Sequence, residues 1–175
     1  AVDIETLTIM ADQGIAFTVL EPSQASHFKR LDEMVWTDVR GGRIDPTRPY
    51  WVRLPGERSI VVFFYDGPVS RAVAFERLLV DGATFADRIA STFNEQRRWP
   101  QIANIATDGE TYGHHHRHGD MALAFALQYI EERGLARLTN YASYLAAHPP
   151  TYEVQIVENT AWSCAHGLGR WSLDC

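Results

Sequence analysis

The chain has 175 residues, of which 46% are hydrophobic and 22% are charged, and its formal net charge is −6. This length suits a single domain with a hydrophobic core, spanning residues 1–175. The basic residues form no concentrated patch in the sequence, which argues against a nucleic-acid partner. No stretch approaches the roughly 20 apolar residues of a membrane helix, so we expect no membrane partner. The cysteines, Cys164 and Cys175, are too few for a disulfide scaffold, and a cytoplasmic location is therefore the default expectation.

The first third of the chain predicts a helix, a strand and a long connection. Asp3 is a plausible N-cap for a helix whose apolar residues recur at helical spacing until Gly14 ends it. Residues 15–20 are short, apolar and partly β-branched, which predicts a strand that ends before Glu21. An irregular stretch then continues to about residue 46, and connections of this length are commonly functional.

The rest of the chain alternates strand and helix patterns. A turn at residues 55–56 predicts a hairpin, and its second strand, residues 60–65, is apolar throughout, as in strands buried on both faces. Predicted helices and strands then follow in this order: helix 68–80, helix 84–93, strand 102–107, helix 121–133 capped by Asp120, helix 139–147 and strand 152–157. The alternation predicts an α/β fold in which crossover helices connect parallel strands, as an open sheet or as part of a barrel.

An acidic residue follows each of the four predicted strands. These residues are Glu21, Asp66, Asp108 and Glu158. Active sites of parallel α/β folds lie at the C-terminal ends of the strands. An acidic residue in this position can equally well cap the next helix. Four of them together nevertheless predict a cluster of acidic side chains at one rim of the sheet.

The segment with the most chemically reactive residues is 106–120. It contains Asp108, Glu110, several glycines and the histidines at positions 114, 115, 116 and 118. Imidazole suits zinc and related ions, but the rings bind a metal only if they converge, and adjacent residues point apart. We therefore favour contacts with ligand hydroxyl groups by His114 and His115, and we expect no metal site.

Residues 107–114, Thr-Asp-Gly-Glu-Thr-Tyr-Gly-His, resemble the fourth signature motif of glycoside hydrolase family 57. This family includes α-amylases, glucanotransferases and branching enzymes. Residues 63–68, 148–150 and 158–167 are also similar to a subgroup of long, mostly uncharacterised bacterial members. The resemblance covers essentially the whole chain.

The resemblance implies an incomplete (β/α)7 barrel and a retaining mechanism on α-glucans that uses two carboxylates and no cofactor. It assigns Asp108 as the catalytic acid/base and Glu110 as a supporting acidic residue. The family carries its nucleophilic Glu in a W-L-x-E-type segment, and no such segment occurs in this chain. We therefore expect the nucleophile upstream, the chain to be the C-terminal portion of a catalytic barrel, and the isolated piece to be inactive.

Further substrate contacts to an oligo- or polysaccharide are expected from Asp66, His114, His115, Glu158 and Trp162. Trp162 is included because it follows a predicted strand end beside Glu158, whereas the other tryptophans are expected in the core. We expect Cys164 and Cys175 to be free thiols. An unpaired strand edge of a partial barrel predicts self-association of the chain.

Two other functions remain open from the sequence. One is a non-catalytic carbohydrate-binding or interaction module with a degenerate site. The other is a metal-dependent hydrolase, similar to a deacetylase, whose histidine cluster would have to converge on the metal.

Overall fold

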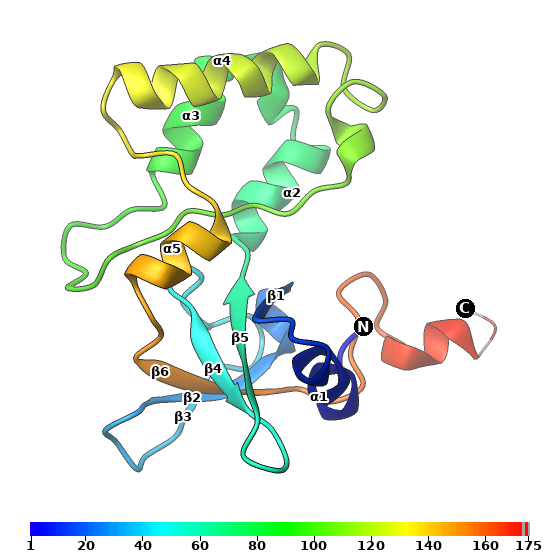
Figure 1. The fold of residues 1–175 in the computed structure, drawn as a ribbon. Coiled ribbons are helices and arrows are strands. Elements are labelled where there is room, and N and C mark those ends of the chain that lie inside the picture. The colour runs from blue at the N-terminus through cyan, green and yellow to red at the C-terminus, as the bar shows by residue number, and fades with distance from the viewer. Residues whose placement is uncertain (173, 175) are drawn as a thin grey trace. The chain divides into compact units, whose positions relative to one another are not determined.

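The computed structural model of the protein describes residues 1–172 and residue 174, and their contacts divide them into two units. The first, which we call the sheet unit, contains residues 1–64 and the C-terminal part of the chain from residue 149. The second, the helical unit, contains residues 65–148. Figure 1 shows the strands of the sheet unit and the helices of the helical unit along the chain. That both units belong to one domain stays a prediction.

The sheet unit is built on a six-stranded sheet in the order β1-β5-β4-β6-β2-β3. Its strands are β1 (Phe17–Leu20), β2 (Ala25–Arg30), β3 (Thr37–Asp38), β4 (Tyr50–Arg53), β5 (Ser59–Phe64) and β6 (Tyr152–Ile156). The pairs β1–β5 and β4–β6 are parallel, and the other three pairs are antiparallel. The predicted α/β class is confirmed, with a mixed sheet in place of a purely parallel one.

The hairpin between β4 and β5 changes the expected position of the acidic residues. β5 is antiparallel to β4, and β4 is parallel to β6, so β5 and β6 run in opposite directions. Their C-terminal ends therefore lie at opposite ends of the sheet. The prediction that Asp66 and Glu158 follow strands at one common rim is wrong, because it treated both strands as parallel although the hairpin reverses the chain.

Strand β5, which lies between β1 and β4, is the most buried strand of the sheet unit. Residues 60–64 are each at most 1% exposed, which confirms the prediction of a strand buried on both faces. Tyr50 packs its ring against Phe64 at 5.8 Å between centroids, and its hydroxyl donates to the carbonyl of Asp45 at 2.8 Å. Helix α1 (Ile4–Asp12) adds Leu7 to the same core, and Asp3 caps it by accepting from Thr6 N–H, as predicted.

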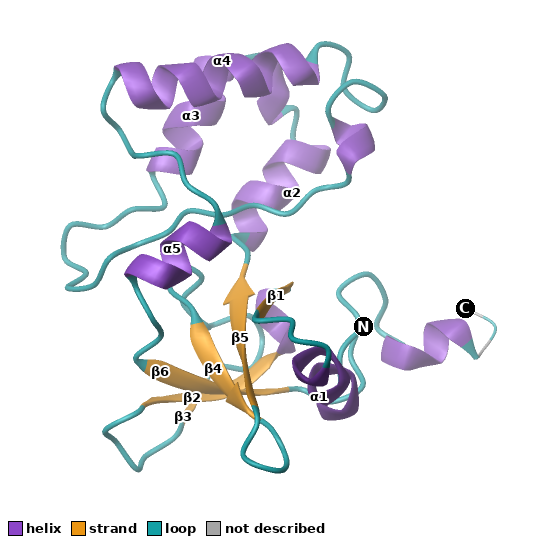
Figure 2. Cartoon of the chain, in the orientation of Figure 1, coloured by secondary structure: helices purple, strands orange, loops and turns teal. Residues whose placement is uncertain are grey.

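The helical unit contains no strand among its residues 65–148, all of which the structure describes (Figure 2). Its helices are α2 (Gly67–Phe75), α3 (Gly82–Ala90), α4 (Gly119–Glu132) and α5 (Tyr141–Ala147). Helices α3 and α4 pack through Phe85, Ala126 and Ile130. They approach closely at Gly82, where a Cβ atom would lie 2.6 Å from the ring of Phe125.

Several predicted elements differ from the structure. The helix predicted over residues 68–80 ends at Phe75, because Arg77 adopts a left-handed conformation with φ of 59°. The N-cap position of α4 is occupied by His118 and not by Asp120, which lies inside the first turn. The stretch from residue 21 to residue 46, expected to be irregular, contains β2 and β3.

The strand predicted over residues 102–107 is wrong, because this segment finds its partners in helix α2. The carbonyl of Asn104 accepts from the backbone N–H of Asp66 at 2.8 Å, and the N–H of Ala106 donates to the Ser70 hydroxyl at 3.0 Å. These bonds replace a strand ladder, so the apolar pattern of the segment reflects packing against helices.

Candidate functional site

Asp108 lies on a tight turn at the surface of the helical unit. It occupies the N-cap position of a short 3-10 helix, Gly109–Thr111, and its carbonyl accepts from Thr111 N–H at 3.0 Å. Its side chain makes no capping hydrogen bond, and the residue is exposed. The turn therefore presents the carboxylate of Asp108 to solvent rather than using it to close the helix.

Backbone hydrogen bonds bring Glu110, His114 and His115 together in the turn that follows Asp108. The carbonyl of Glu110 accepts from the backbone N–H groups of His114 and His115, at 3.1 and 2.9 Å. The two imidazole rings lie edge to face with 5.1 Å between their centroids. All three residues are exposed, so one backbone turn places an acidic and two imidazole side chains at the surface near Asp108 in sequence.

The four histidines of this loop do not converge. Nε2 of His116 lies 3.0 Å from the carbonyl oxygen of Ala74, and the rings of His114 and His115 contact each other instead. Within residues 1–172 and 174, no group of three His, Cys, Asp or Glu side chains is arranged to hold a metal ion. The convergence that a metal-dependent hydrolase would need is thus not seen in the described part of the chain.

The segment that leads into this turn is held by buried polar groups. Ser70 is 5% exposed and accepts a hydrogen bond from the segment at Ala106. Asn104, which is part of the segment, is 9% exposed. Tyr141 donates its hydroxyl to Oδ1 of Asn104 at 3.0 Å, and burial raises the pKa of Tyr141. Sequence reasoning did not select these residues, since buried Ser, Asn and Tyr side chains have no characteristic spacing.

Asp66 uses both carboxylate oxygens within the helical unit. Oδ1 accepts from the backbone N–H of Val69 at 2.9 Å and thereby caps α2, while Oδ2 accepts from the hydroxyl of Thr92 at 3.3 Å. The residue is half-buried. The structure therefore gives Asp66 the helix-capping role that the sequence left open.

Glu158 and Trp162 lie in the sheet unit. Oε2 of Glu158 accepts from the backbone N–H of Ile4 at 3.0 Å, at the start of α1, and the residue is exposed. The side chain of Trp162 is 61% exposed. Glu21, the remaining strand-end acid, caps the 3-10 helix Pro22–Gln24 by accepting from Ser23 N–H. Three of the four acids thus bond to backbone N–H groups, and only Asp108 makes no capping bond.

Of the two cysteines, only Cys164 is among the residues that the structure describes. Sγ of Cys164 lies 3.2 Å from Nδ1 of His166. Cys175 lies outside the described residues, so the expectation of two free thiols stays a prediction.

A hollow of about 720 Å³ adjoins the histidine-rich loop inside the helical unit. Its polar side is formed by His115, Arg117 and His118, and its apolar side includes Met121 and Phe125. This volume falls in the range of small-molecule sites, about 300–1,000 Å³. The mixture of hydrogen-bond donors and an aromatic ring suits a polar ligand with an apolar face.

The sequence model of glycosyl hydrolase family 57 matches residues 1–157. The chain belongs to glycosyl hydrolase family 57. The match includes the motif around Asp108 and ends just before Glu158, so Trp162 and Cys164 lie beyond it. No curated protein matches the chain.

Membership in family 57 confirms the predicted family and places the chain in the glycoside hydrolase class, whose substrates are carbohydrates. Asp108 lies within the matched residues, on an exposed turn. The helices that the structure describes are all too short or too polar to cross a bilayer.

Proposed function

We propose that this family 57 chain supplies Asp108 as the general acid/base for retaining hydrolysis or transfer of α-glucans. The observation that carries the proposal is that Asp108, alone among the four acids predicted to follow strands, makes no capping hydrogen bond. Its exposed carboxylate stands in the segment that resembles the family's signature motif. Glu110, on the same turn, is proposed as a supporting acidic residue.

The proposed reaction has two steps and needs two carboxyl groups about 5–5.5 Å apart. In the first step, Asp108 gives its proton to the glycosidic oxygen as the C–O bond breaks, and a nucleophilic carboxylate bonds to the anomeric carbon. In the second step, Asp108 takes a proton from water or from a sugar hydroxyl, whose oxygen displaces the carboxylate from the anomeric carbon. Hydrolysis and transfer differ only in which oxygen attacks.

The nucleophile is proposed to come from outside residues 1–175, because no segment of the chain resembles the family's nucleophile motif. On this proposal the chain forms the C-terminal portion of an incomplete (β/α)7 barrel and does not turn over substrate alone. The parallel pairing of β1 with β5 supports a barrel origin for this part of the sheet.

Substrate contacts are proposed for His114 and His115, supported by the hollow that His115 lines. Asp66, Glu158 and Trp162 are retained as proposed substrate-binding residues. For Asp66 and Glu158 this role would add to the backbone bonds that they make. The proposal also includes a cytoplasmic location, supported by the low cysteine content, and self-association of the chain.

The test is Asp108→Asn in the catalytic domain that contains residues 1–175. Because the substitution keeps the shape and removes the proton donor, hydrolysis of an α-glucan should fall by about 10²–10⁴-fold. The loss should be much smaller for a nitrophenyl or fluoride glycoside, whose leaving group departs with little protonation. Asp120→Asn is the matched control, since Asp120 is an exposed aspartate in the first turn of α4 and does not occupy the N-cap position of that helix.

The proposal fails if Asp108→Asn reduces the rates on activated and unactivated substrates equally. It also fails if Asp120→Asn costs as much as Asp108→Asn. Loss of activity on treatment with a chelator would instead support the metal-dependent alternative.

A further inference from the structure

A hollow of about 300 Å³ lies in the sheet unit beside β4 and β6. These two strands, both labelled in Figure 1, are parallel and pair at Trp51 opposite Glu153. Residues that follow this pair on both strands line the hollow, including Arg53 and Gln155. The hollow lies entirely within one unit, so the sheet itself sets its shape.

Trp36 forms the aromatic side of the hollow. The residue is half-buried, and Lys29 places Nζ 5.2 Å from the centroid of the indole ring without lining the hollow itself. Trp36 directly precedes β3, which pairs with β2 through Thr37. The ring is therefore held from its backbone and from one cation, which favours a single orientation toward the hollow.

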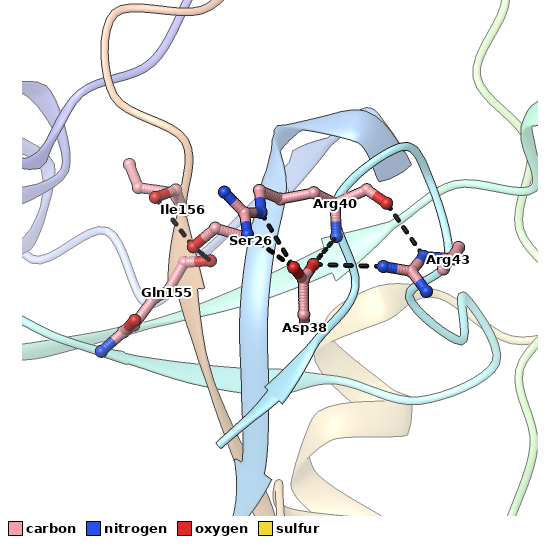
Figure 3. A network of polar contacts seen from close by, with 6 residues as sticks. All are labelled: Ser26, Asp38, Arg40, Arg43, Gln155 and Ile156. Carbon is pink, nitrogen blue, oxygen red and sulfur yellow. Dashed lines mark hydrogen bonds and ion pairs between the residues drawn. The ribbon is translucent and has the colours of Figure 1, made fainter.

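Figure 3 shows polar contacts of Ser26, Gln155 and Ile156, which line the hollow, and of Asp38, which follows Trp36 by two residues. Asp38 accepts hydrogen bonds from the backbone and the guanidinium of Arg40 and from the guanidinium of Arg43. The contact with Arg40 holds the pKa of Asp38 well below its usual range. On β2, the Ser26 hydroxyl lies within hydrogen-bond distance of the carbonyls of Gln155 and Ile156, at 3.0 and 3.3 Å.

Two carboxylates face the hollow in fixed positions. Glu153 is bound by Lys29 and by Arg53, each at 3.4 Å, and its side chain is 13% exposed. Glu158 is anchored by Ile4 N–H through one oxygen. Both residues line the hollow and carry hydrogen-bond acceptors, and Arg53 in the same lining carries donors.

The charges of the lining select the class of ligand. Arg53 is already paired with Glu153, so the hollow has no excess positive charge to attract an anion. Among the described residues no three His, Cys, Asp or Glu side chains are grouped to hold a metal ion, so the hollow does not have the ligand set of a metal site. What remains is a neutral ligand with hydroxyl groups around an apolar face, and sugars have this composition.

We propose that this hollow binds a neutral hexose unit of an oligosaccharide. The apolar face of the sugar stacks on Trp36, and its hydroxyl groups bond to Glu153, Arg53 and Glu158. This is a binding site in the sheet unit that performs no chemistry, and only its choice of sugar ligand rests on the proposed function. It would hold a carbohydrate chain independently of the Asp108 turn.

The experiment is calorimetric titration of the 175-residue chain with maltotriose, and with inorganic phosphate as an anionic probe. Maltotriose should bind and phosphate should not. Trp36→Ala should weaken maltotriose binding by about tenfold or more, as expected for an aromatic anchor, and Trp36→Phe should recover part of it. Trp171→Ala is the matched control, because Trp171 likewise has a basic side chain, that of Arg170, 5.2 Å from its ring centroid and does not line the hollow.

Glu153→Gln gives a second variant that changes a hydrogen-bond acceptor and keeps the shape, and it should also weaken binding. Circular dichroism melting of each variant separates lost binding from lost folding. The inference is overturned if the chain does not bind maltotriose at millimolar concentration, or if Trp36→Ala and Trp171→Ala have equal effects. Tighter binding of phosphate than of maltotriose would also overturn it.

The same titration distinguishes this inference from the proposed function. Asp108→Asn should leave maltotriose affinity at the hollow unchanged while it removes hydrolysis by the complete catalytic domain. If hydrolysis persists in Asp108→Asn and Trp36→Ala still weakens binding, the proposed function fails and this site stands. If Asp108→Asn abolishes the binding, the titration reports the catalytic turn and the site in the sheet unit is refuted.

Discussion

The hydroxyl oxygen of Ser70 accepts a hydrogen bond from the backbone N–H of Ala106 at 3.0 Å. This bond joins the first turns of α2 to the segment that leads into the Asp108 turn. Because the segment has no strand ladder, its backbone groups depend on such side-chain partners. The position of Asp108 is thus linked to a buried serine on a helix distant in sequence.

Ser70→Ala should destabilise the helical unit by about 0.5–1.5 kcal/mol, because it removes the hydrogen bond from the backbone N–H of Ala106. Ser70 itself is 5% exposed. Urea unfolding measures the change. Ser91→Ala, at an exposed serine that donates to the carbonyl of Arg88, should stay within about 0.5 kcal/mol of the wild type. Equal losses in the two variants would contradict the role given to Ser70.

Asp66 and Asp108 should differ in their contribution to stability. Asp66→Ala removes the cap of α2 and should cost about 0.5–2 kcal/mol. Asp108→Ala removes no capping bond and should stay within about 0.5 kcal/mol of the wild type. Thermal melting of both variants checks this difference. A large loss for Asp108→Ala would show that its carboxylate has a structural partner, and would weaken the argument for its catalytic role.

The elements that the sequence predicted well are those whose pattern is local. Helix α1, strand β5 and helix α4 each have a cap or a continuous apolar run that marks them without reference to the rest of the chain. Strand β2 was missed because His27, Lys29 and Arg30 give it a polar composition, although it pairs with β6 over most of its length. Strand direction depends on how the hairpin inserts between β1 and β6, and local periodicity does not contain this information.

The residues of the candidate site likewise divide into those marked by a local sequence pattern and those whose role depends on the folded chain. Asp108 could be found because the residues around it form a contiguous motif. The capping roles of Asp66 and Glu158 depend on N–H groups whose orientation appears only in the folded chain. The hollow at Trp36 combines residues from β2, β4, β6 and the connection before β3, and no sequence spacing joins them.

Stability should fall at alkaline pH through Tyr50. Burial raises the pKa of Tyr50 far above its usual value of about 10, and the side chain is 1% exposed. Below about pH 10 the phenol is protonated in both folded and unfolded chains, so its contribution is fully present. Above about pH 10 the unfolded chain loses the proton and the folded chain keeps it, so the free energy of unfolding falls as pH rises.

Tyr50→Phe tests this dependence. At neutral pH it should cost about 0.5–1.5 kcal/mol, because the bond to the carbonyl of Asp45 is lost. Above about pH 10 its free energy of unfolding should decline less steeply than that of the wild type. Urea unfolding between pH 7 and pH 11 gives both curves, and parallel curves above pH 10 would contradict the prediction.

The free edge of β1 should mediate self-association of the chain. Among the described strands β1 pairs only with β5, and Val61 N–H donates to the carbonyl of Ala16. In a parallel ladder alternate residues face the partner strand, and because Ala16 faces β5, the backbone groups of Val19 point away from β5. Ile15, just before β1, is 42% exposed and adds apolar surface next to this edge. Such edges pair with other chains unless a charge protects them.

Ile15→Lys should therefore shift the chain toward the monomer, since a lysine beside an edge strand opposes pairing with a second copy. Ile9→Lys is the matched control, because it makes the same substitution at an exposed isoleucine of α1 that lies outside the sheet. Light scattering over a range of protein concentrations should show association of the wild type and of Ile9→Lys, and a smaller mass for Ile15→Lys. A wild type that stays monomeric at high concentration would refute the role of the edge. If Ile9→Lys alone dissociates the chain, the contact is made by helix α1 instead.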